Sequence, residues 1–153
     1  MKKHFKIIIP IVLLSPIILY IAIAVTNNCI ADKIEKDLIK YNLPKDTVLV
    51  DSISAAGKLV GSGNGMQYMG SILVSSDLTE QEISKYYNKQ FDYIEVRRQE
   101  TEALDFIMAN KHFKRLKDTT VNTYYSVTCW DENTTENLND FIIGLLDLDL
   151  RAH

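Results

Sequence analysis

Apolar residues divide the chain into an amino-terminal run and a mixed remainder. Residues 7–25 carry no charge. As a helix rising 1.5 Å per residue they would span roughly 28 Å, close to the ~30 Å hydrocarbon core of a bilayer. Lys2, Lys3 and Lys6 directly precede the run. The pattern predicts a single membrane-spanning helix through residues 7–25, with a cytoplasmic amino terminus and the rest of the chain outside.

Two interpretations of this run remain open. A retained signal anchor is favoured by its length, which is at the upper end for a signal peptide. The alternative is a signal cleaved at Ala22-Ile23-Ala24, and the protein would then be secreted. Either way, the chain divides into an anchor or signal segment over 1–28, a stalk helix and linker over 29–46, and an extracytoplasmic domain over 47–153.

The remainder shows helical and strand periodicities in turn. Ile30, Ile34 and Leu38 recur at helical spacing. The predicted elements are a helix over 29–41, strands over 47–60 and 66–75 that form a hairpin, a helix over 77–90, and strands over 92–99 and 121–130. Residues 100–117 fit either a helix or a strand, 136–146 a helix, and 146–151 a strand. This order predicts an α+β domain with a mainly antiparallel sheet and helices packed on it.

Charge and composition exclude some functions. The chain has 17 basic and 20 acidic residues, and leaving out the three lysines before the apolar run leaves 14 basic residues against the same 20. This acidic balance argues against nucleic-acid binding. Two cysteines are too few for a disulfide scaffold or a four-cysteine zinc site. We therefore expect no metal and no cofactor.

The glycine-rich segment 61–65 is the most distinctive motif. Phosphate-binding loops normally open a helix, whereas both flanks here have strand composition. A hairpin turn is therefore favoured, and a loop for an anionic ligand is the alternative. Exposed aromatic side chains close to this hairpin would add a surface for a partner. The candidate binding residues are Gly61, Gly63, Asn64, Gly65, Tyr68, Tyr124 and Trp130.

Cysteine and histidine positions bear on redox state and catalysis. Cys29 and Cys129 could form a disulfide if both lie outside the cytoplasm, or Cys129 could be a small buried core residue. No histidine lies near Cys129 in sequence, and His112 sits among the cations Lys111, Lys114, Arg115 and Lys117. No catalytic residue is assigned, and enzymatic activity is not the favoured interpretation.

Three stretches carry a resemblance to known proteins: Gly61 to Tyr68 followed by Ile72 to Leu78, Tyr124 to Val127 with Trp130, and the ending Asp147 to His153. They resemble an uncharacterised family of small membrane-anchored proteins of Gram-positive bacteria, in which glycine would be expected at Ala152. The resemblance covers about half of the domain. It implies a bacterial, single-pass membrane protein and no known activity.

The sequence therefore leads to three hypotheses about function. The first is a non-enzymatic, membrane-tethered module that binds an envelope protein or an anionic wall polymer. The second is a small ligand-binding or hydrolytic domain that uses the loop over 61–65. The third is an immunity-type protein.

Overall fold

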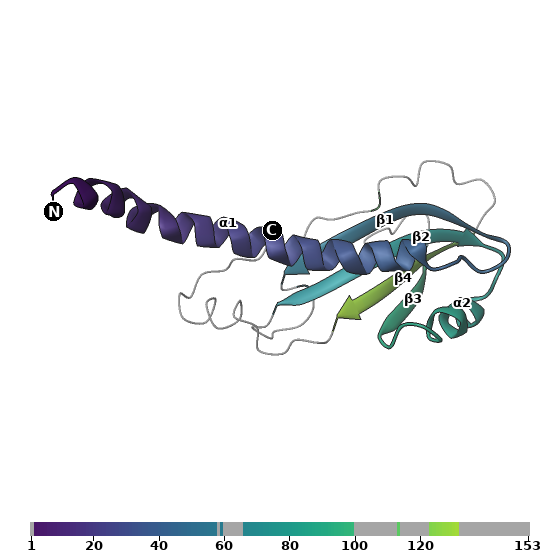
Figure 1. The fold of residues 1–153 in the computed structure, drawn as a ribbon. Helices are drawn as coiled ribbons and strands as arrows, with labels where there is room; N and C mark the ends of the chain where they lie inside the picture. The colour runs from purple at the N-terminus through teal and green to yellow at the C-terminus, as the bar shows by residue number, and fades with distance from the viewer. Residues whose placement is uncertain (1, 58, 60–65, 100–112, 114–122, 132–153) are drawn as a thin grey trace.

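A computed structural model describes residues 2–57, 59, 66–99, 113 and 123–131. Within these residues the chain forms α1 (Lys2–Lys40), β1 (Thr47–Gly57), β2 (Gln67–Ser76), α2 (Glu80–Tyr87), β3 (Ile94–Gln99) and β4 (Tyr124–Asp131), as Figure 1 shows. Every one of these elements overlaps a predicted one. The predictions for 61–65, for 136–151 and for nearly all of 100–117 lie outside the described residues.

The four strands form one antiparallel sheet in the order β1-β2-β4-β3. β1 and β2 make the predicted hairpin, with Thr47 opposite Ser76 and Gly57 opposite Gln67. A bulge between Leu49 and Asp51 shifts the register of β1. β4 is inserted between β2 and β3, although β3 precedes it by more than twenty residues in the chain. Together with the two helices, this sheet confirms the α+β class.

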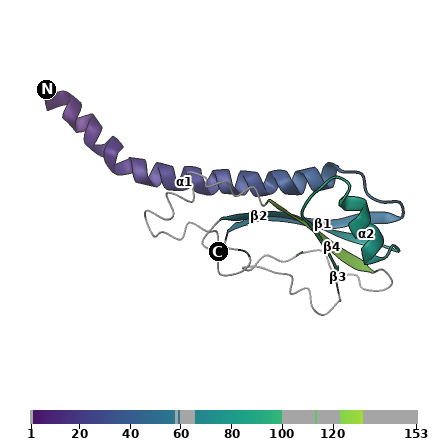
Figure 2. The ribbon, with the colours of Figure 1, turned by 90° about the horizontal axis from the view of Figure 1, so that it is seen from below.

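α1 is one uninterrupted helix of 39 residues, about 58 Å long at 1.5 Å per residue. Its carboxy-terminal part lies along the sheet, and its amino-terminal part projects well beyond it (Figure 1). The projecting part bends (Figure 2). Pro10 and Pro16 both belong to the amino-terminal half of α1, and a proline bends a helix because it removes one backbone hydrogen bond.

Within the segment predicted as a stalk helix and linker over 29–46, the helical part packs on the sheet. Ala31 and Leu38 are buried against the sheet, and Ile34 packs beside them. Earlier on the same side of α1, Ile23 and Asn27 are also buried. The predicted helical periodicity was right, but the sheet itself covers the apolar side.

Both helices pack on the same face of the sheet (Figure 2). Leu38 of α1 and Ile83 and Tyr87 of α2 share one core cluster with strand residues of β2, β3 and β4. α2 begins with a capping box, in which Thr79 and Glu82 each bond the other's backbone N–H. On the opposite face, Leu73 packs with Phe113 in a smaller cluster.

Candidate functional site

The backbone of α1 closely approaches the sheet at Gly70 in the middle of β2. A Cβ atom at this position would lie 2.3 Å from the backbone nitrogen of Glu35 and 2.7 Å from the carbonyl carbon of Ile34. Backbone atoms cannot turn aside as side chains can. Glycine at this position therefore lets the helix backbone rest directly on the strand.

Hydrogen bonds on both sides of this contact tie α1 to the hairpin. Ser52 Oγ donates to Glu35 Oε1 at 2.5 Å, and Ser54 Oγ donates to Asp32 Oδ1 at 2.5 Å. Further toward the amino terminus, Tyr68 Oη donates to Asn27 Oδ1 at 3.1 Å. The three bonds set the rotation of α1 about its axis and its position along the sheet.

From Ile17 to Ile21, α1 is apolar on every side. The five consecutive residues from Ile17 to Ile21 are all exposed, with between 45 and 63% of their surface accessible. Five successive helical residues point around the whole circumference. By length and composition, α1 over Leu14–Lys40 could span a membrane or act as a signal sequence.

The structure does not gather the predicted aromatic binding residues on one surface. Tyr68 is 2% exposed and faces α1, where it packs against Ala31 and Met66. Tyr124 and Trp130 are half-buried and belong to the opposite face of the sheet, at opposite ends of β4. Gly61, Gly63, Asn64 and Gly65 lie outside the described residues.

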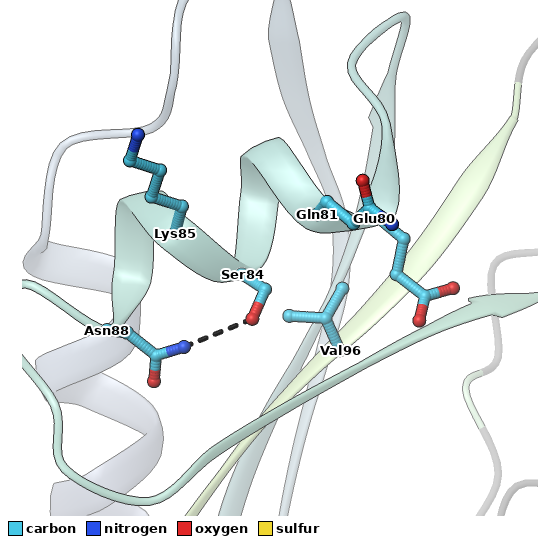
Figure 3. Close-up of a pocket in the computed structure, with 6 residues that line it drawn as sticks. All are labelled: Glu80, Gln81, Ser84, Lys85, Asn88 and Val96. Carbon is cyan, nitrogen blue, oxygen red and sulfur yellow. Dashed lines mark hydrogen bonds between the residues drawn. The ribbon is translucent and has the colours of Figure 1, made fainter.

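A shallow polar groove runs between α2 and β3 (Figure 3). It has a volume of about 390 Å³ and is lined by Glu80, Gln81, Ser84, Lys85, Asn88 and Val96. Within it, Asn88 Nδ2 donates to Ser84 Oγ at 3.0 Å. Its lining offers amide, hydroxyl and charged groups around the methyl groups of one valine. Sequence reasoning missed this groove because its lining is simply the polar side of an amphipathic helix.

Four aromatic rings join the end of α1 to α2. Tyr41 lies with its ring centroid 5.3 Å from that of Tyr86, 5.8 Å from Tyr87 and 5.6 Å from Phe91. Tyr86 Oη also donates to the carbonyl oxygen of Asn42 at 2.7 Å. The cluster holds α2 against the end of α1. Sequence reasoning missed this cluster, because its rings come from two separate predicted helices and no local pattern records a contact between them.

Both cysteines are free thiols, so the disulfide considered from sequence is not formed in this structure. Cys29 is exposed on α1, whereas Cys129 is buried in the main core cluster. Burial raises the pKa of the Cys129 thiol to about 11, and the negative charges of Asp131, Asp92 and Asp37 add to the effect. Cys129 is therefore an unreactive core residue at neutral pH.

The part of the chain that the structure describes holds no group of three or more His, Cys, Asp or Glu side chains able to bind a metal ion. Comparison of the chain with protein-family models, with curated proteins and with solved structures found no match. The features of the chain that bear on function are therefore the geometry of α1, the sheet and the groove.

Proposed function

We propose that the chain is a membrane-tethered domain at the bacterial cell envelope, with its amino terminus in the cytoplasm and its sheet outside. The observation that carries the proposal is the composition of α1 along its length. One helix is exposed and apolar on every side from Ile17 to Ile21, and then packs on the sheet from Ala31 to Leu38. A bilayer would cover the first part as the sheet covers the second.

The proposal favours a retained anchor over a cleaved signal. Cleavage after Ala24 would fall within α1, between the buried side chains Ile23 and Asn27. It would remove Ile23 from the domain that covers it. A retained segment keeps every buried residue of α1 in place.

The role of the domain in this proposal is to bind a partner rather than to catalyse a reaction. The groove between α2 and β3 is the concave surface that this proposal assigns to the partner. Its amide, hydroxyl and charged groups suit a polar segment of an envelope protein.

The location is tested on intact, wall-stripped cells by adding protease and by measuring the mass of the untreated chain. We expect the domain to be degraded and the untreated chain to retain its first 25 residues. A chain shortened to begin near Val25 would instead be a secreted protein. Protection of the domain from protease would contradict the proposed topology.

A matched pair of substitutions tests the anchor itself. Ile18 is 63% exposed in the apolar part of α1, and Ile39 is 40% exposed near its carboxy-terminal end. Arginine near the centre of a bilayer costs roughly 2.5–3.5 kcal/mol on insertion scales. Ile18→Arg should therefore shift the chain out of the membrane fraction, whereas Ile39→Arg should not. Equal distributions for the two variants would contradict membrane insertion of this segment.

Partner binding is tested in the same cells with a photo-crosslinking residue at Ser84 in the groove. The control carries it at Lys45, which is exposed in the turn before β1. A partner in the groove should give one defined adduct from position 84 and none from position 45. Absence of any adduct specific to position 84 would count against the groove as the binding surface.

A further inference from the structure

The sheet has a defined end that lies nearest the apolar part of α1. Tyr68 packs against Ile30 and Ala31, Gly70 lies against Ile34 and Glu35, and Ile72 shares a core cluster with Leu38. β2 therefore runs beside α1 in the same direction, away from the apolar part. Because the sheet is antiparallel, β1 and β4 finish, and β3 starts, at the near end (Figure 1).

Two aromatic side chains lie at this near end, on the two strands away from the hairpin. Trp130 is the penultimate residue of β4 and is half-buried, and Tyr93 immediately precedes β3 and is 48% exposed. The two are adjacent, because the backbone N–H of Trp130 donates to the carbonyl oxygen of Tyr93 at 3.1 Å. Tryptophan and tyrosine are the residues that favour the boundary between a bilayer and water.

The height of Trp130 above the bilayer follows from the pairing. Trp130 is opposite Met69, next to Gly70, and so lies level with about residue 33 of α1. At 1.5 Å per residue that is roughly 12 Å beyond Val25, the last residue of the apolar run. The headgroup layer occupies about 5–8 Å of this distance, which leaves a gap of roughly 4–7 Å between the level of Trp130 and the headgroups.

The sheet cannot swing away from this position. α1 contains neither glycine nor proline between Pro16 and its end at Lys40. The backbone contact at Gly70 and the bonds of Glu35 and Asp32 to the hairpin fix the helix to the sheet. The angle between the domain and the bilayer is therefore set by the helix.

We propose that the end of the sheet that carries Tyr93 and Trp130 faces the bilayer and lies close to its lipid headgroups, while the opposite end points away. This inference rests on the proposed membrane tether. Asp92 and Asp131 adjoin the two aromatic residues, so the approach to the headgroups is made by rings rather than by cations. It does not require anionic lipid.

Trp130 is the only tryptophan in the chain, so the tryptophan fluorescence of the unaltered protein reports on this position alone. The full chain is reconstituted into phosphatidylcholine vesicles that contain a lipid with a nitroxide on its headgroup, and quenching of tryptophan fluorescence is measured. The comparison protein carries Val48→Trp and Trp130→Phe. Val48 is 65% exposed at the start of β1 and pairs with Ser75, six residues along β2 from Met69.

The two reporters differ in height by about 20 Å at ~3.4 Å per strand residue, so we expect at least about twofold stronger quenching of Trp130. Equal quenching, or stronger quenching of the Val48 reporter, would overturn the proposal. If the Val48 variant loses its native circular dichroism, Lys45→Trp with Trp130→Phe replaces it.

Flotation of the vesicles is measured first. A chain that does not float with the vesicles contradicts the membrane tether. A chain that floats but whose Trp130 is not quenched contradicts only the proposed orientation of the sheet.

Discussion

Gly70 determines how close a helix can come to the sheet. Replacing it with alanine would place a methyl group against the backbone of Glu35, so α1 would have to move outward and loosen its other contacts. Overpacking of this kind typically costs about 1–3 kcal/mol. We expect Gly70→Ala to lower the free energy of unfolding in urea by that amount.

Ser54 provides the matched control for this substitution, because it pairs with Gly70 on β1. Ser54→Ala removes the bond to Asp32 without adding any atom to the interface, and a hydrogen bond contributes about 1 kcal/mol. A Gly70→Ala protein as stable as the wild type would show that the helix does not rest on this strand.

The two cysteines should differ sharply in reactivity. Cys29 is exposed, whereas Cys129 is buried with a pKa raised to about 11. At pH 8 a thiol-alkylating reagent should therefore modify one site in the folded protein and two in urea, as counted by mass. A Cys29→Ser variant should react only after unfolding. Two thiols that appear only after reduction would instead reveal a disulfide between them.

The same pKa predicts a loss of stability at high pH. In the unfolded chain the Cys129 thiol returns to its ordinary pKa of 9.0, whereas in the folded protein it stays protonated up to about pH 11. Between pH 9 and about pH 11 the thiol ionises in the unfolded chain but not in the folded protein, so ionisation lowers the free energy of the unfolded state alone. The stabilisation by the neutral buried thiol is thus complete below pH 9 and declines from there to pH 11. A Cys129→Ala variant should show a weaker decline over this window.

At the scale of the element, the capping box determines where α2 begins. Glu82 Oε2 accepts a bond from the Thr79 backbone N–H at 2.8 Å and another from the Thr79 hydroxyl at 2.8 Å. These bonds lower the pKa of the Glu82 carboxyl, the backbone bond having the larger effect. Losing an N-cap threonine costs about 1 kcal/mol, so Thr79→Ala should lower the melting temperature.

The pH dependence of this substitution follows from the sign of the pKa shift. A carboxyl with a lowered folded pKa stabilises the protein above its ordinary pKa and loses that effect as the pH falls through the lowered value. The difference between wild type and Thr79→Ala should therefore be larger at pH 7 than at pH 3. Ser84→Ala, which removes only an exposed bond to Asn88, serves as the control. A difference that does not change with pH would contradict the role of Glu82.

At the scale of the whole molecule, α1 belongs both to the tether and to the core. A chain that begins at Val25 loses the projecting apolar part and the buried Ile23 but keeps Asn27, Ala31 and Leu38. We expect it to fold and to remain in solution. A chain that begins at Asn42 also loses the core side chain Leu38, and a buried leucine alone is worth about 2–5 kcal/mol.

Circular dichroism during heating distinguishes these two truncated chains. The chain from Val25 should unfold in one cooperative transition, whereas the chain from Asn42 should show none. A cooperative transition in both would mean that the sheet folds without α1 and that residues 29–41 are a stalk after all.

Much of this architecture is local and could be predicted. The apolar run, the β1–β2 hairpin, the Thr79–Glu82 cap and the strand around Val127 each depend on periodicity or spacing within a few residues. Backbone geometry converts such patterns directly into helices, turns and strands. For the same reason the α+β class followed from the order of these elements.

Contacts between distant segments were decided only by the tertiary structure. The place of β4 between β2 and β3 depends on which distant strands fit together, and no local pattern records this. The residues around Tyr68 in the sequence do not show whether its side chain is exposed or, as in this structure, buried and bonded to Asn27. Helical periodicity over 29–41 showed that one side of α1 is apolar, whereas the close approach at Gly70 determined that the sheet covers it.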